Sequence, residues 1–89
     1  MICKRWTLYG RVQGVGLRHF LRVHGVRLQL EGYVKNLPDG SVEVVAQGEE
    51  EKVLKLKTII LQGNGFSRLE DIQEEDFPIG NYGSFHIEY

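Results

Sequence analysis

The sequence predicts an α+β fold in which one antiparallel sheet carries two helices on the same face. Two stretches repeat apolar residues at the 3.6-residue spacing of an amphipathic helix, and the other regular stretches alternate apolar and polar residues as strands do. The order is strand, helix, strand, strand, helix, strand, with a short strand at the end. With 89 residues, 42% of them hydrophobic, the chain suits one compact core, so we expect a single domain over residues 1–89.

The first third of the chain holds a strand, a glycine-rich turn and a helix. Residues 2–12 alternate as a strand, and from residue 17 the spacing changes and predicts a helix to about Gln29. The apolar face of this helix consists of Leu17, Phe20, Leu21, His24 and Leu28. Gly25 lies inside it and costs about 1 kcal/mol relative to alanine, so we expect a close contact between helix and sheet there.

A hairpin follows. Residues 31–37 and 41–47 are predicted strands, and the turn between them is favoured because Pro38 presets φ and Gly40 tolerates positive φ. Asn36 stands just before this turn. Its amide can donate and accept hydrogen bonds without ionising, so it can position a water molecule; the alternative is an asparagine that caps the turn.

The last third completes the pattern. A second helix has the apolar stripe Val53, Leu56 and Ile60 and is stopped by residues 63–65, which are Gly-Asn-Gly. The charged residues 68–76 predict an edge strand, and residues 84–89 predict the terminal strand. Two interleaved strand–helix–strand units of this kind form a split βαβ, ferredoxin-like sandwich.

The glycine-rich turn between the first strand and the first helix is the strongest candidate site. Glycines allow a tight turn, and consecutive backbone amides at a helix N-terminus attract an anion. We therefore expect an oxyanion cradle, with the planar cation of Arg18 beside it. The stretch that forms this cradle runs from Gly10 to Arg18. The alternative is a structural turn with a solvated arginine.

Charge is divided unevenly along the chain. Residues 1–36 hold seven basic side chains and one acidic one, whereas residues 37–89 hold four basic and eleven acidic ones. The basic half contains the cradle, which favours a small anionic ligand over a long nucleic acid. The alternative is that the two halves pair across the fold.

Several classes of site have no support in the sequence. The single cysteine, Cys3, cannot form an internal disulfide, and no signal peptide or membrane span is visible, so we expect a cytoplasmic protein. No Cys/His spacing predicts a metal, and we expect neither metal nor cofactor. His19, His24 and His86 are interpreted as surface or boundary residues. A site with one arginine, backbone amides and one amide side chain lacks a general acid. It therefore suits a phosphate whose leaving group departs as a stable anion, such as the carboxylate of an acyl phosphate.

Two motifs resemble those of the acylphosphatase family. Residues 10–20, GRVQGVGLRHF, resemble the signature G-R-V-Q-G-V-x-F-R-x-F, and residues 32–42, GYVKNLPDGSV, resemble G-x-V-x-N-x-x-D-G-x-V. The ending, residues 83–89, is similar to the family's terminal strand. Leu17 stands where the family usually has phenylalanine, and residues 63–67 lack the family's proline-rich character.

The resemblance implies a ferredoxin-like fold and metal-independent hydrolysis of the carboxyl–phosphate bond, without a covalent intermediate. It implies that Arg18 and the amides of residues 13–18 hold the phosphoryl group and that Asn36 orients the attacking water. The substrate phosphate itself would accept the proton of the water. The expected partners are a small acyl phosphate and inorganic phosphate, as product and inhibitor, for a monomer that binds neither nucleic acid nor membranes.

Two other functions stay open. A ferredoxin-like module that binds RNA would need an aromatic RNP1-like run on its open sheet face, and the sequence has none. A non-catalytic domain that binds an anion or docks a partner resembles the acylphosphatase-like domain of hydrogenase-maturation proteins. The presence of both Arg18 and Asn36 favours the enzyme, and a turnover assay separates the two.

Overall fold

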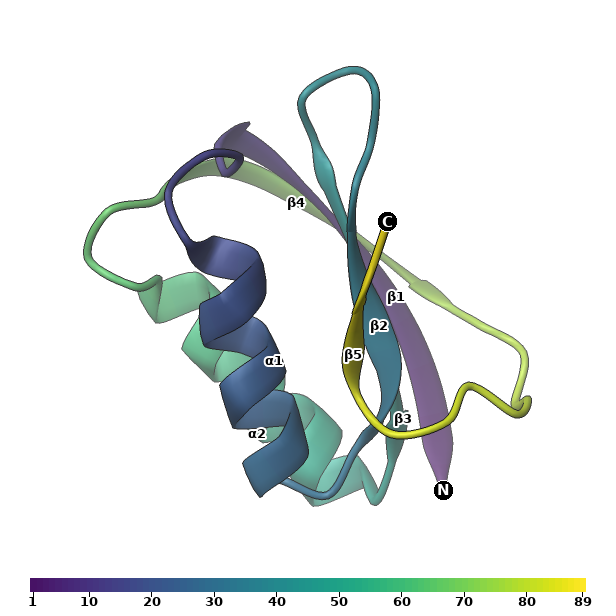
Figure 1. Cartoon of the computed structure of the whole chain (residues 1–89). Helices are drawn as coiled ribbons and strands as arrows, with labels where there is room; N and C mark the ends of the chain where they lie inside the picture. The colour runs from purple at the N-terminus through teal and green to yellow at the C-terminus, as the bar shows by residue number, and fades with distance from the viewer.

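A computed structural model describes all residues from 1 to 89, and it has one five-stranded sheet with both helices on one face (Figure 1). The elements are β1 (Ile2–Arg11), α1 (Leu17–Arg27), β2 (Glu31–Asn36), β3 (Val42–Gly48), α2 (Glu50–Gln62), β4 (Arg68–Asp76) and β5 (His86–Glu88). The strand order in the sheet is β4-β1-β3-β2-β5. The predicted fold class is confirmed. Neither helix is long and apolar enough to cross a membrane.

The four longer strands are antiparallel to their neighbours, as expected, whereas β5 runs parallel to β2. β5 reaches that position because the chain leaves β4 at one edge of the sheet and crosses to the other edge (Figure 1). The side chain of Gln47 on β3 fixes this crossing, since its amide donates to the carbonyl of Gly80 and accepts from the N–H of Gly80, both at 2.9 Å.

The core lies between the helices and the sheet. Trp6, Leu8 and Val34 from the strands are fully buried, and they meet Leu21 of α1 and Leu56 of α2. The alternation predicted for β1 and the stripe predicted for α2 therefore describe the faces that the structure buries. Burying an apolar side chain of this size contributes about 1.5–3 kcal/mol, which makes this layer the main source of stability.

Helix α1 ends at Arg27, two residues before the predicted end. Gln29 has φ 58°, and the N–H groups of Gln29 and Leu30 donate to the carbonyls of Val26 and Gly25. This is a Schellman motif, which normally has glycine at the left-handed position. Because Gln29 occupies that position here, the sequence carries no visible stop signal.

Gly25 of α1 lies against the ring of Phe85, as the predicted close contact requires. A Cβ atom on Gly25 would lie 2.3 Å from Cδ1 of Phe85, which is itself 2% exposed. The absent side chain thus lets α1 approach the segment that begins β5. The position of β5 depends on this contact.

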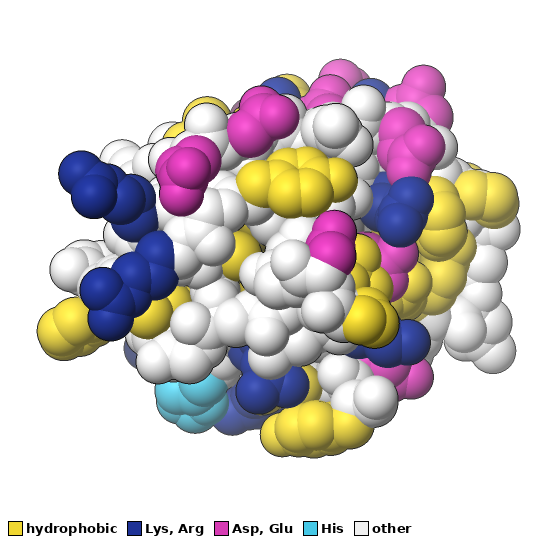
Figure 2. Space-filling view, turned by 90° about the horizontal axis from the view of Figure 1, so that it is seen from above, with side chains coloured by type: hydrophobic (Ala, Val, Ile, Leu, Met, Phe, Trp, Pro, Cys, Tyr) yellow, Lys and Arg dark blue, Asp and Glu magenta, His cyan; other side chains and the backbone are white.

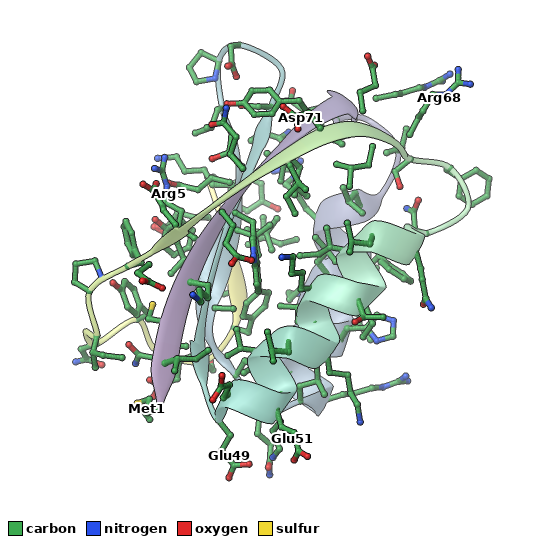
Figure 3. The ribbon with its side chains drawn as sticks, turned by 180° about the vertical axis from the view of Figure 1, so that it is seen from behind. Met1, Arg5, Glu49, Glu51, Arg68 and Asp71 are labelled. Atoms are coloured by element: carbon green, nitrogen blue, oxygen red, sulfur yellow. The ribbon has the colours of Figure 1, made fainter.

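Two cations near the start of β1, Lys4 and Arg5, pair with carboxylates of the second half of the chain. Lys4 contacts Asp76, and Arg5 contacts Glu75 of β4 as well as Glu43 of β3; Figure 3 shows Arg5 on the sheet. The alternative reading of the charge asymmetry, that the halves pair across the fold, therefore holds for β1.

Candidate anion-binding site

The predicted cradle is a loop between the end of β1 and the start of α1. Gly14 and Gly16 have φ of 73° and 75°, a conformation that side chains with Cβ atoms rarely adopt. None of the backbone N–H groups of residues 13–19 is paired with a backbone carbonyl; the N–H of Phe20 is the first that is, at 3.1 Å from the carbonyl of Gly16. The loop and the first turn of α1 therefore offer a run of free donors at the positive end of a helix.

Arg18 lies in the first turn of α1 and is half-buried. No carboxylate forms an ion pair with it, in contrast to Lys4 and Arg5, so its fork of donors stays available to a ligand. The carbon at the centre of its guanidinium lies 5.4 Å from the centroid of the Tyr89 ring. This distance is within the range of a cation–π contact, but Tyr89 is 93% exposed, so the contact restrains the guanidinium only weakly and does not neutralise it.

A hollow joins the cradle to the end of the chain. Its walls consist of Val12, Gly14, Gly16, Leu17, Arg18, His19, Ile87 and Tyr89. Figure 2 views the molecule from above, where basic side chains lie at the left and lower edges, and acidic ones lie mostly at the top and right with other basic ones among them. Leu17 turns into the core, where it is 3% exposed, so the side chain that departs from the family motif lies behind the cradle.

Asn36 is the last residue of β2. It lies two residues after the buried Val34, so it shares the sheet face that carries the helices and the cradle. Its Oδ1 is buried and has no hydrogen-bond partner in the chain. A buried acceptor of this kind costs free energy unless a water or a ligand meets it.

The turn after Asn36 is capped by another residue. Asp39 accepts hydrogen bonds from the N–H of Ser41, at 2.9 Å, and from its hydroxyl, and these bonds lower the pKa of the Asp39 carboxyl. The alternative role of Asn36 as a turn cap is therefore wrong. The Oδ1 of Asn36 is therefore available to a water molecule or a ligand.

The side chain of Gln13 connects the cradle to this hairpin. Its Nε2 donates to the carbonyl of Leu37 and to the carbonyl of Ser41, both at 2.9 Å. Leu37 directly follows Asn36, so one amide group links the loop that precedes Arg18 to the turn that follows Asn36. We expected only the backbone of Gln13 to matter, and nothing in the sequence marks its side-chain contact. The approach of Tyr89 to Arg18 is the second feature without a signal in the sequence.

The remaining candidates lie elsewhere. A second hollow, on the sheet face away from the helices, includes Arg5, but the Arg5 guanidinium already forms ion pairs with Glu43 and Glu75. Of the three histidines, His19 is exposed and borders the cradle hollow, while His24 packs edge-on against the ring of Phe20. No three residues of the types that bind metals lie together.

The chain is similar to known proteins over most or all of its length. The family model described as Acylphosphatase matches residues 4–87. The chain is 94% identical to an acylphosphatase of Petrotoga mobilis over all 89 residues, which is the whole length of both. The crystal structure of acylphosphatase from Bacillus subtilis is similar over the full length of both chains, with 34% identity and a TM-score of 0.95. A full-length HypF structure in the phosphate- and nucleotide-bound form shares 26% identity and a TM-score of 0.90, over 99% of this chain and 12% of HypF.

Proposed function

This chain belongs to the acylphosphatase family and hydrolyses acyl phosphates, and from that premise we propose which of its residues perform the reaction. The observation that carries the proposal is that the N–H groups of residues 13–19 and the guanidinium of Arg18 have no hydrogen-bond partner, while Asn36, whose neighbour Leu37 is hydrogen-bonded to Gln13, has a buried and unsatisfied Oδ1. The substrate phosphoryl group occupies the cradle.

The phosphoryl oxygens accept hydrogen bonds from the backbone amides of residues 13–18 and from the guanidinium of Arg18. The amides are fixed by the loop before the substrate arrives, and the guanidinium is carried on the first turn of α1, where it contacts the exposed Tyr89 ring. Charge that builds on the phosphoryl oxygens in the transition state is stabilised without further reorganisation. This is the larger part of the catalytic effect.

Asn36 holds the attacking water. Its buried Oδ1 accepts a hydrogen bond from the water and so directs a lone pair of the water oxygen toward phosphorus. The oxygen–phosphorus bond forms while the bond from phosphorus to the acyl oxygen breaks. The electron pair of that bond leaves with the carboxylate.

The proton of the water passes to an oxygen of the phosphoryl group, so the products are the carboxylate and dihydrogen phosphate. The two negative charges of the acyl phosphate are conserved in these products. The leaving carboxylate is a weak base and needs no acid to protonate it. This agrees with a site whose assigned side chains, Arg18 and Asn36, include no carboxylic acid or imidazole that could act as a general acid.

Further expectations belong to the same proposal. The chain acts as one domain over residues 1–89, works as a monomer in the cytoplasm and needs no metal. Inorganic phosphate, which resembles the transferred group, inhibits by competing for the cradle.

The test is the hydrolysis of benzoyl phosphate in EDTA by the wild type and by Arg18→Ala and Asn36→Ala. Each substitution is expected to lower kcat/KM by about 100-fold or more, because each removes a group that acts on the reacting atoms. Arg27→Ala, which removes a cation at the other end of α1, is the matched control and should keep wild-type turnover. Circular dichroism checks that each variant is folded.

Three results would contradict the proposal. Turnover that survives Arg18→Ala would place the site elsewhere. Turnover that requires a metal would rule out hydrolysis by these residues alone. A folded wild type that binds phosphate without turnover would favour an anion-binding domain, in line with its similarity to one part of HypF.

A further inference from the structure

The loop between α2 and β4 touches the cradle through a single side chain. Nδ2 of Asn64 donates to the carbonyl of Val15 at 2.8 Å, although the two residues are 49 positions apart. None of the roles assigned above uses Asn64. Its contact with the phosphate-binding loop suggests that it acts on that loop.

The side chain of Asn64 is held at both of its polar atoms. Its Oδ1 accepts from the N–H of Phe66 at 3.0 Å and from the N–H of Ser67 at 2.9 Å. Because the amide group is planar, these two bonds also set the direction in which Nδ2 donates. The donor is therefore aimed at Val15 by its own loop.

Holding the carbonyl of Val15 also orients the next amide. In a trans peptide the C=O and the following N–H lie in one plane and point in opposite directions. Asn64 pulls the carbonyl of Val15 toward the α2–β4 loop, so the N–H of Gly16 points the other way. That N–H is one of the unpaired cradle donors.

Gly16 needs such a restraint. It has φ 75° and ψ 12°, and glycine moves between backbone conformations more easily than any other residue. A Cβ atom on Gly16 would lie 3.9 Å from Nδ2 of Asn64 and would meet no other atom within 4 Å outside its chain neighbours, so little besides Asn64 packs against this position. Without the Asn64 bond, the peptide between Val15 and Gly16 can rotate and remove its N–H from the cradle.

We propose that Asn64 is a positioning residue for phosphate, which fixes the Gly16 N–H toward the phosphoryl oxygens through the carbonyl of Val15. This inference rests on the proposed function of the cradle. Since the phosphoryl group is present in substrate, transition state and product, the contribution is to binding at every stage. It therefore changes KM and the inhibition constant of phosphate together, and it also changes kcat, because the same N–H stabilises the charge that builds on the phosphoryl oxygens in the transition state.

The test compares Asn64→Ala with Ser67→Ala, a change in the same loop at a side chain that makes no hydrogen bond. For Asn64→Ala we expect KM for benzoyl phosphate and Ki for inorganic phosphate to rise by about 3- to 10-fold, the worth of one net hydrogen bond. We expect kcat to fall as well, but by less than in Arg18→Ala because only one of the cradle amides is affected, and Ser67→Ala to match the wild type. Asn64→Asp keeps the two bonds to Phe66 and Ser67 but loses the donor, so it should raise Ki as well.

A direct readout is the amide signal of Gly16 in two-dimensional NMR during titration with inorganic phosphate. In the wild type this signal should move on binding, and in Asn64→Ala its shift should be much reduced at saturation. A role limited to the stability of the loop would not change it. Both Asn64 variants are expected to fold, because Asn64 lies in a surface loop and is only half-buried.

The inference is overturned if folded Asn64→Ala keeps wild-type Ki, KM and Gly16 shift, or if only the charged Asn64→Asp raises Ki. Should Asn64→Ala fail to fold, Asn64→Ser, which is too short to reach Val15, takes its place. Arg18→Ala separates a wrong role for Asn64 from failure of the proposed function of the cradle. If Arg18→Ala also keeps phosphate affinity, the cradle itself is misassigned; if Arg18→Ala loses it and Asn64→Ala does not, only the role of Asn64 is wrong.

Discussion

Gln13 shows how a single side chain sets the distance between two parts of an active site. The two groups that act on substrate in the proposed mechanism, Arg18 and Asn36, belong to different elements. Gln13 Nε2 joins those elements by two hydrogen bonds of 2.9 Å, to Leu37 and Ser41. An error of about 1 Å in the position of a reacting group can cost about 100-fold in rate, so we expect this link to affect catalysis.

Replacing Gln13 by methionine is expected to lower kcat by about 10- to 100-fold with a smaller change in KM, because the water held by Asn36 loses its fixed place relative to phosphorus. Steady-state kinetics with benzoyl phosphate measure both constants. Gln62→Met is the control, since it makes the same chemical change at the exposed end of α2. An unchanged kcat for Gln13→Met would show that the hairpin holds Asn36 without this link.

The sequence was sufficient to propose Arg18 and Asn36 but not the residues that would position them. Those two stand inside motifs that can be recognised in one stretch of sequence. Gln13 and Asn64 act through bonds to carbonyl groups 24 and 49 positions away, which depend on how distant segments meet. A side chain that donates to a backbone carbonyl can do so whatever the residue type of its partner. The sequence therefore contains no second residue that would point to the contact.

At the scale of elements, the fit between α1 and the segment leading into β5 depends on the absence of one side chain. Gly25→Ala is expected to destabilise the protein by about 1–3 kcal/mol, because the new methyl group overlaps the Phe85 ring. The free-energy cost of this overlap exceeds the roughly 1 kcal/mol that alanine gains over glycine in helix propensity. Urea unfolding followed by circular dichroism measures the change.

Phe85→Leu tests whether that overlap is the cause. The smaller side chain leaves room for the methyl group, so the double variant should lose less stability than the two single variants added together. Strict additivity would mean that Gly25 is required for another reason, such as the approach of the helix backbone.

Predictions for the elements succeeded where periodicity is strong and failed where a single residue decides. The alternation of β1 and the stripe of α2 were enough to define both elements. The end of α1 was wrong by two residues because Gln29 adopts a left-handed conformation that usually needs glycine. The parallel pairing of β5 was not predicted, since three paired residues contain no pattern that distinguishes parallel from antiparallel.

For the whole molecule, the charge asymmetry of the sequence has two outcomes. The cations at the start of β1 are neutralised by the acidic edge strand β4. Glu74 on that strand also accepts hydrogen bonds from Lys57 and from the ring N–H of Trp6, and these bonds lower the pKa of the Glu74 carboxyl. Arg18 has no such partner. The sequence alone could not tell these cations apart, because their neighbours come from the other half of the chain.

A free cation in a cradle of free amides predicts that phosphate stabilises the folded protein. At phosphate concentrations of ten times Kd the stabilisation is about 1.4 kcal/mol, which corresponds to a rise in Tm of about 5 °C or more for a domain of this size. Thermal unfolding in phosphate, compared with chloride at equal ionic strength, measures this shift. Arg18→Ala should lose most of it and Arg27→Ala should keep it; an equal shift in both would indicate nonspecific anion binding.

The chain ends where its proposed substrate enters. Tyr89 borders the hollow and lies over Arg18, whereas Met1 is at the far end of β1 from the cradle (Figure 1). For protein engineering the two termini are therefore not equivalent. A purification tag, fluorescent label or surface tether attached before Met1 leaves the entrance open, while the same attachment after Tyr89 crowds the entrance and disturbs the ring that restrains Arg18.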